Sequence, residues 1–203
     1  MNPKSKFIAL VVTALVNAVV LSTPVSAETF TNLRGALDEV AEKYQIRFGL
    51  EYAAQDKDLR PISLDFSAKS VDTVLNQLVS QKTDYVWAFA DNVYDIFPKS
   101  NWDSILDLQI SEFGIKELSS KEASAAVGQI PEIKHWLASH SVSRRELYVC
   151  VGSCWEHSEK LVTLSLQAIT FRTLLNALVT AFGTSHWMVC RYGDEQEYIG
   201  IYF

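Results

Sequence analysis

Apolar and polar positions follow one another along this chain in two kinds of pattern. Residues 62–66 alternate between apolar and polar side chains, which predicts a strand with one buried face. After Ser70, apolar residues stand at positions 71, 74, 75, 78 and 79, the spacing of one buried helix face. Ser70 has the side chain and the place of an N-cap. The pattern therefore predicts a strand followed directly by an amphipathic helix.

Two further strands follow this helix and close a hairpin. Residues 85–89 alternate and are rich in aromatic side chains, and residues 93–97 form the second alternating run. Asp91 and Asn92 between them are typical turn residues. Upstream, residues 33–44 carry a helical apolar stripe and residues 46–52 alternate as a strand does.

The same pattern returns one hundred residues later without a gap. Between 62–87 and 162–187, eight of 26 aligned positions are identical, where chance gives about one or two. Thr170 replaces Ser70 as the N-cap. We interpret this as a duplication. The identical pairs are Leu64/Leu164, Ala68/Ala168, Thr73/Thr173, Leu75/Leu175, Asn76/Asn176, Leu78/Leu178, Val79/Val179 and Trp87/Trp187.

The repeat divides the chain into two units, 28–98 and 105–203, with a linker at 99–104. The second unit opens with an additional segment that includes a helix over 119–127. Its own strands are expected at 146–151, at 162–166 and in a hairpin that ends at the C-terminus. We expect an α+β fold of two tandem, small, two-layer modules, each with two helices on one face of a small mixed sheet.

The N-terminus has the layout of a secretory signal peptide. Lys4 and Lys6 precede an apolar run at 7–21, and Pro24 and the small residues 25–27 provide a cleavage site. The run is shorter than the about 18 residues of a membrane helix, although an uncleaved anchor is the alternative. We expect residues 1–27 to be removed, leaving a protein without a membrane span in the periplasm or secreted.

Charge argues against a nucleic-acid partner. The formal net charge is −6, and removal of two lysines with the leader lowers it to −8. The one dense basic spot is Arg144 with Arg145. Nucleic-acid binding needs a basic face, so we expect none.

The repeated segments resemble a known family, the secretin and TonB N-terminal short domain. The stretch "ISLDFSAKSVDTVLNQLVSQKTDYVWAFADNVYDIF" is similar to that domain's strand, capped helix with paired leucines, aromatic strand and hairpin. The preceding "LRGALDEVAEKYQIRFGLEY" fits its opening helix and strand, and "VTLSLQAITFRTLLNALVTAFGTSHWMV" fits the pattern again. Residues 182–184 and 191–197 match it more loosely.

The resemblance implies an exported, non-enzymatic contact and assembly module. In the family such modules precede an outer-membrane barrel, as parts of secretion channels or as signalling domains that contact an inner-membrane regulator. We therefore expect an envelope protein as partner: a barrel, a secretin or a regulator. With about 176 residues left after cleavage and two units to form from them, we expect no barrel of many spanning strands in this chain. The family supplies no catalytic residue and no cofactor.

Three cysteines bear on the chemistry of an exported chain, where disulfides are expected. A bridge between Cys150 and Cys154 is one possibility, and one between Cys150 and Cys190 is another. Cys150, Cys154 and His157 also have the spacing of a partial zinc site, which lacks the fourth ligand. We expect the first bridge and no metal.

A periplasmic small-ligand-binding or hydrolytic protein is the alternative function. Cys190 with His186, or a serine with His157, would be the nucleophile and base. Four residues along a strand separate Cys190 from His186 by about 13 Å, beyond hydrogen-bond reach. Contact residues are expected elsewhere. Trp155 lies in a polar loop where nothing forces its burial. Tyr198 and Tyr202 lie on a terminal strand that we expect to be an open sheet edge.

Overall fold

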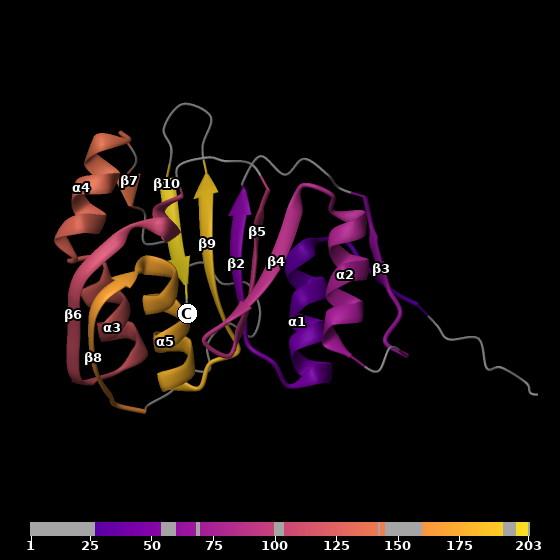
Figure 1. The fold of residues 1–203 in the computed structure, drawn as a ribbon, viewed down its shortest axis with the longest axis horizontal. Helices are drawn as coiled ribbons and strands as arrows, with labels where there is room; N and C mark the ends of the chain where they lie inside the picture. Colours follow the sequence, from indigo (N-terminus) through magenta and orange to yellow (C-terminus); the bar gives the residue numbers. More distant parts are fainter. Residues whose placement is uncertain are drawn as a thin grey trace, which may run out of the picture.

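A computed structural model describes residues 27–53, 60–67, 70–99, 104–141, 143–144, 160–192 and 198–202 (Figure 1). The expected leader at 1–27 lies, except for its last residue, outside these ranges. The helices are α1 Leu33–Tyr44, α2 Val71–Gln81, α3 Ser120–Val127, α4 Pro131–Ser139 and α5 Phe171–Phe182, with a short 3₁₀ helix η1 at Ile105–Asp107. The strands are β1 Glu28–Phe30, β2 Phe48–Ala53, β3 Ile62–Leu64, β4 Tyr85–Ala90, β5 Val93–Pro98, β6 Gln109–Leu118, β7 Ser143–Arg144, β8 Val162–Thr170, β9 His186–Tyr192 and β10 Tyr198–Tyr202.

The helices and their caps follow the local sequence, and the α+β class is confirmed. The Ser70 hydroxyl accepts a hydrogen bond from the Thr73 backbone N–H at 3.3 Å, and Thr170 accepts one from Thr173 at 3.1 Å. Both bonds satisfy a free N–H of the first helical turn. The apolar stripe of α5 is buried along its length, and that of α2 is buried at positions 74, 75 and 78.

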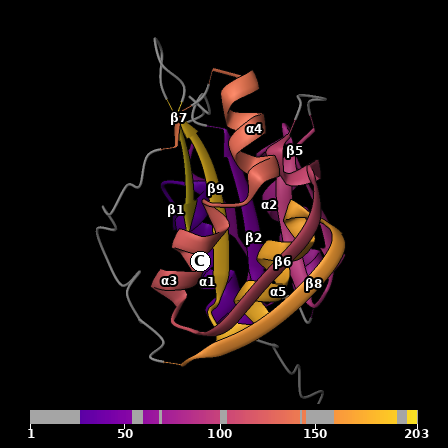
Figure 2. The ribbon, with the colours of Figure 1, turned by 90° about the vertical axis from the view of Figure 1, so that its left-hand side faces the viewer.

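Six strands form one mixed sheet in the order β4-β5-β2-β9-β10-β7 (Figure 1). Two antiparallel ribbons, β1 with β3 and β6 with β8, lie beside it, and Figure 2 shows β6 and β8 side by side. The two separate small sheets expected from the sequence are thus joined edge to edge. The joint is a parallel pairing of β2 and β9, from Phe48 opposite His186 to Ala53 opposite Arg191. The pairing satisfies the backbone groups of two strands that are buried on both faces.

The order of pairing in the first half of the sheet is found again in the second. In β4-β5-β2, a hairpin is followed by a parallel strand, and β9-β10-β7 is built in the same way. Because β2 and β9 are parallel, β9 runs antiparallel to β4. The second set of three strands is therefore related to the first by a rotation that keeps the order of the strands and reverses their direction. Such a rotation also exchanges the two faces of the sheet.

The helices accordingly cover opposite faces, which gives three layers (Figure 1). Phe48, Leu50 and Ile96 of the sheet pack against the helices α1 and α2. On β9, Met188 and Cys190 join that same core, whereas Trp187 and Val189 face the core formed with α5, β6 and β8. The strand β9 therefore contributes to both cores, as period-two alternation in a central strand requires.

The additional segment of the second unit forms β6 and α3. The strand β6 pairs antiparallel with β8, in the way that β1 pairs with β3. Ser119 caps α3 in a full capping box with Glu122, and the predicted helix over 119–127 is confirmed. The strand β1, of only three residues, was not predicted, because so short a run carries no readable alternation.

Candidate functional site

The strand β4 forms one end of the six-stranded sheet. It pairs with β5 alone among the strands that the structure describes. Its sequence, Tyr-Val-Trp-Ala-Phe-Ala, contains no charge, proline or glycine. Natural proteins usually protect such an edge with lysine, proline, a bulge or a covering segment. None of the first three is present in β4, which makes it the clearest candidate for a contact site.

The hairpin geometry decides which backbone groups of β4 face outward. Asp91 and Asn92 both have positive φ, 54° and 63°, as a two-residue type I′ turn requires. Hydrogen-bonded and non-bonded pairs alternate along such a hairpin, and Ala90 opposite Val93 is the closing pair. The bond from the Lys99 N–H to the Asp84 C=O at 2.7 Å falls in the same series.

It follows that residues 86, 88 and 90 direct their N–H and C=O groups at β5. Trp87 and Phe89 direct theirs away from it. Pro98 lies opposite Tyr85 in a non-bonded pair, where its missing N–H costs nothing. The free edge of β4 thus offers two residues with complete donor and acceptor pairs, and both residues are aromatic.

The side chains of these two residues are held by α2 and β5. The ring centroids of Phe89 and Tyr94 lie 4.6 Å apart, and those of Trp87 and Tyr94 lie 5.7 Å apart. Trp87 Nε1 donates to Asn76 Oδ1 at 3.0 Å, and the Tyr94 hydroxyl donates to Asp72 Oδ1 at 3.4 Å. Phe89 is nevertheless 56% exposed, and a fixed, exposed aromatic side chain is typical of interface anchors.

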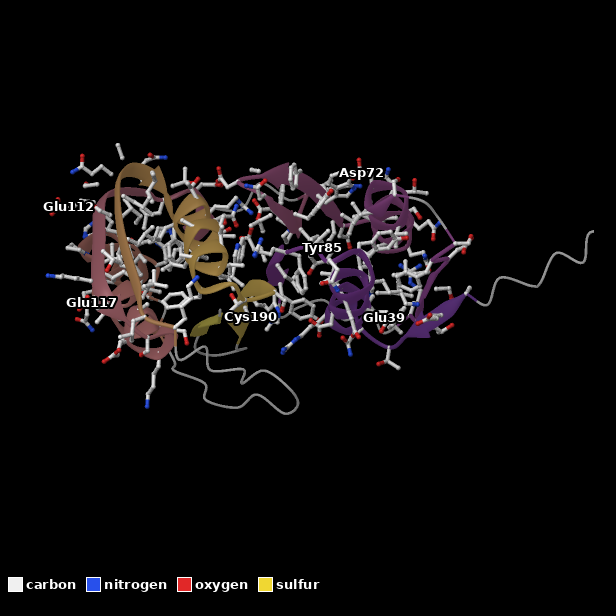
Figure 3. All side chains as sticks on the ribbon, turned by 90° about the horizontal axis from the view of Figure 1, so that it is seen from below. Glu39, Asp72, Tyr85, Glu112, Glu117 and Cys190 are labelled. Carbon is white, nitrogen blue, oxygen red and sulfur yellow. The ribbon has the colours of Figure 1, made fainter. Side chains whose placement is uncertain are left out.

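The inner part of the same hairpin is buried. Figure 3 shows Tyr85 in the interior and Asp72 at the surface. Tyr85 is only 2% exposed, whereas Ala88 and Ala90 near the turn are exposed. The open stretch therefore comprises the last four residues of β4, from Trp87 to the turn.

A second cluster lies at the seam, where the first-half strands meet α5. Asp95 of β5, Gly49 of β2 and Trp187 of β9 are opposite one another across three adjacent strands. A β-carbon at residue 49 would lie 2.1 Å from Trp187 Cζ2 and 2.7 Å from Asp95 Oδ1. Only glycine leaves room there, so the indole ring lies over β2.

Asn176 of α5 connects this row across the seam. It accepts a hydrogen bond from Trp187 Nε1 at 2.5 Å and donates to Asp95 Oδ2 at 3.3 Å. Burial raises the pKa of Asp95 to about 6, although Arg172 and the bond from Asn176 act against that rise. Asp95 Oδ1 has no hydrogen-bond partner within the described part of the chain.

Beside this row, Glu51 is held by Ser104 of the linker and by Arg172 of α5. Its carboxylate accepts a hydrogen bond from the Ser104 hydroxyl at 2.6 Å and lies 3.5 Å from the Arg172 guanidinium. Burial raises the pKa of Glu51, with Ser104 and Arg172 opposing that effect. The Arg172 guanidinium also lies 4.8 Å from the centre of the Phe97 ring, a cation–π contact.

Buried carboxyls with raised pKa values occur in active sites and also in structural networks. Here both oxygens of Glu51 are engaged by protein groups. Asp95 is 1% exposed and lies beneath α5. Within the described residues both carboxyls are buried, Glu51 being 4% exposed, so we interpret the seam as structural.

The structure describes only part of the contact and disulfide residues expected from the sequence. Cys150, Cys154 and Trp155 lie outside the described residues. Tyr198 and Tyr202 belong to β10, which pairs with β9 along its length and with β7 at residues 198–199. At residues 198–199 the strand β10 therefore has a described neighbour on each side, whereas β4 has one on a single side along its whole length. The uncharged run of β4 beside a two-residue turn is compatible with an edge, but the run of β10 is equally uncharged, so this signal does not single out β4.

The remaining candidates for chemistry do not form a site in the part of the chain that is described. No three His, Cys, Asp or Glu side chains gather there as metal ligands, and the spacing ending at His157 lies outside it. His186 stacks on Phe48, with ring centroids 4.9 Å apart. Cys190 is buried, as Figure 3 shows. No helix among the described segments has the length and hydropathy to cross a membrane.

No protein-family model, curated protein or solved structure matches this chain. The resemblance to the secretin and TonB N-terminal short domain therefore stays a prediction.

Proposed function

We propose that this protein is an exported interaction and assembly module that binds its partner by strand pairing at β4. The observation that carries this proposal is the combination found at the sheet end. Two aromatic residues, Trp87 and Phe89, direct backbone donors and acceptors outward from a strand without charges. Main-chain bonds supply affinity in this mode of recognition, and the side chains supply specificity.

The corresponding strand of the second half supports the idea. The strand β9 occupies the place in β9-β10-β7 that β4 occupies in β4-β5-β2. Its outer edge is taken by β2 over six residue pairs. In the second half, the edge that corresponds to the free edge of β4 is thus paired with a strand of the same chain.

The N-terminal sequence and the family resemblance support a location in the cell envelope. The layout of residues 1–27 indicates export, to the periplasm or beyond it. The partner is then a protein of the same compartment. The closed seam supports a function in contact and not in catalysis.

Site-specific photo-crosslinking in the native host tests this proposal. A photoreactive phenylalanine analogue at residue 89 is expected to give discrete adducts, because that side chain lies on the pairing edge. Residue 161 is the matched control, since Leu161 is 60% exposed and Phe89 is 56% exposed. Adducts of equal yield at both positions, or at neither, would contradict the proposal.

A further inference from the structure

We infer that the strand that pairs with β4 is β4 of a second copy of this chain, antiparallel, with a two-fold axis at Ala88. This inference rests on the proposed function, because it names the partner of the same edge. It follows from the backbone register, the charges and the side chains of the strand.

The register follows from the outward-facing groups. An antiparallel bonded pair needs one outward-facing residue from each strand. With the axis at Ala88, Trp87 of each copy lies opposite Phe89 of the other, and all four outward groups of each strand are used. With the axis at Trp87, Phe89 would lie opposite Tyr85, whose N–H already donates to the Lys82 C=O at 2.9 Å. That register leaves the Phe89 carbonyl unpaired, which is unfavourable when water is excluded.

Charge is compatible with self-pairing in this register. No residue of β4 is charged, so the paired strands bring no like charges together. The flanking acids Asp84 and Asp91 lie opposite Asn92 and Tyr85 of the second copy. Carboxylate therefore never lies opposite carboxylate. The net charge, −6 for the full sequence and −8 without the two leader lysines, repels two copies at long range, and salt screens that repulsion.

Side chains complete the match on both faces of the sheet. On the α2 face, Trp87 lies opposite Phe89 of the second copy, twice, and cross-strand aromatic pairs stabilise sheets. The exposed ring of Phe89 is covered by this contact. On the other face, Ala88 lies opposite its own copy in a non-bonded pair, where Cα atoms are about 4.5 Å apart.

Disulfide trapping of Ala88→Cys tests the axis directly. A Cα separation of about 4.5 Å lies within the range of a disulfide. We expect a covalent dimer under mild oxidation. Ala90→Cys is the matched control, because in this register the two copies of residue 90 are offset by about 14 Å. Both variants retain the three native cysteines, so a bridge through those appears equally in each. Equal dimer yields overturn the inference.

Sedimentation of the mature protein provides a second, independent measurement. Ala88→Lys places two ammonium groups opposite each other, and the dissociation constant is expected to rise at least about tenfold. Ala90→Lys, which faces Val86, should change it little. Added salt should strengthen the wild-type dimer. A wild type that stays monomeric, or one that forms species larger than dimers, overturns the inference.

Failure of this inference is distinguishable from failure of the proposed function. If residue 89 crosslinks to a different protein while the purified chain stays monomeric, β4 is a contact edge but its partner is not a second copy. If residue 89 crosslinks to nothing in the native host and Ala88→Cys also gives no dimer, both proposals are wrong.

Discussion

Two tryptophans one hundred residues apart make the same hydrogen bond in opposite surroundings. Trp87 Nε1 donates to Asn76 Oδ1 at 3.0 Å, and Trp187 Nε1 donates to Asn176 Oδ1 at 2.5 Å. Asn76 is exposed and Trp87 half-buried, whereas Asn176 and Trp187 are completely buried. The hydrogen bond is therefore determined by the repeated helix and strand. Its burial depends on what surrounds them.

The neighbouring strand makes the difference between the two pairs. The strand β9 has β2 beside it, and Asn176 also binds Asp95 across the seam. The strand β4 has no described neighbour on its outer side, and Asn76 faces solvent. The same local unit thus forms a joint in one half of the molecule and an edge in the other.

Gly49→Ala is expected to have the largest effect, because it breaks the joint. The added methyl group would lie 2.1 Å from the Trp187 ring. This steric clash can be relieved only if the indole ring moves away from β2. We expect a loss of about 3 kcal/mol or more in the free energy of unfolding, measured by urea denaturation. Gly35→Ala is the control, since its β-carbon meets nothing closer than 3.4 Å, and it should be neutral or stabilising. Equal effects of the two changes would show that the seam is not tightly packed.

The substitutions Asn176→Ala and Asn76→Ala each remove one of the two tryptophan–asparagine hydrogen bonds. Removal of Asn176 leaves the buried Trp187 N–H and Asp95 without this partner, so we expect a loss of about 3 kcal/mol. Removal of Asn76 exposes the Trp87 N–H to water, and the expected loss is below about 1 kcal/mol. Similar losses in the two variants would contradict the assigned difference in burial.

Asp95→Asn sharpens the comparison through pH. The pKa of Asp95 is about 6 in the folded chain, above the ordinary 3.8. The neutral acid is thus the favoured form on folding, and its stabilising contribution is complete below pH 4 and is lost as pH rises through 6. The variant should therefore be more stable than the wild type at neutral pH, by about 2 kcal/mol.

The pH effect is read as a difference between these two proteins. Burial also raises the pKa of Glu51 and lowers that of His186, and the two act in opposite senses on stability. Both groups are present in each protein, so the difference isolates Asp95. Parallel stability curves from pH 4 to pH 8 would mean that this carboxyl does not titrate as described.

Phe89→Ser should have the smallest effect on the fold. The side chain is largely exposed, and surface changes usually stay within about 0.5 kcal/mol. The same change should weaken strand pairing at β4, measured by sedimentation or by crosslinking from residue 90. A large loss of stability without a change in association would show that Phe89 serves the fold instead.

The local elements were predictable because they depend on neighbours in sequence. Ser70 and Thr170 were recognised as N-caps, and Asp91 with Asn92 as a turn, from residue type and spacing alone. The parallel joint of β2 with β9 was not predictable, since it connects strands that lie far apart in the chain. The alternation of apolar and polar residues in a strand does not indicate which distant strand it pairs with.

The edge at β4 was not predicted, for the same physical reason. Whether a strand is terminal depends on the order of the whole sheet, and the sequence of Tyr198 to Tyr202 resembles an edge as much as β4 does. The close packing of the Trp187 ring on Gly49 was not predictable either, because neither residue by itself indicates such a contact. Trp155 and the Cys150–Cys154 pair remain predictions.

The parallel joint also has a consequence for how the molecule unfolds. Six residue pairs connect β2 with β9, and the side chains of β9 contribute to both cores. If either half unfolds, the other loses part of its hydrophobic core. Heating should therefore produce a single cooperative transition. A fragment cut at the linker would expose a second bare strand, and the separated pieces should precipitate or recombine.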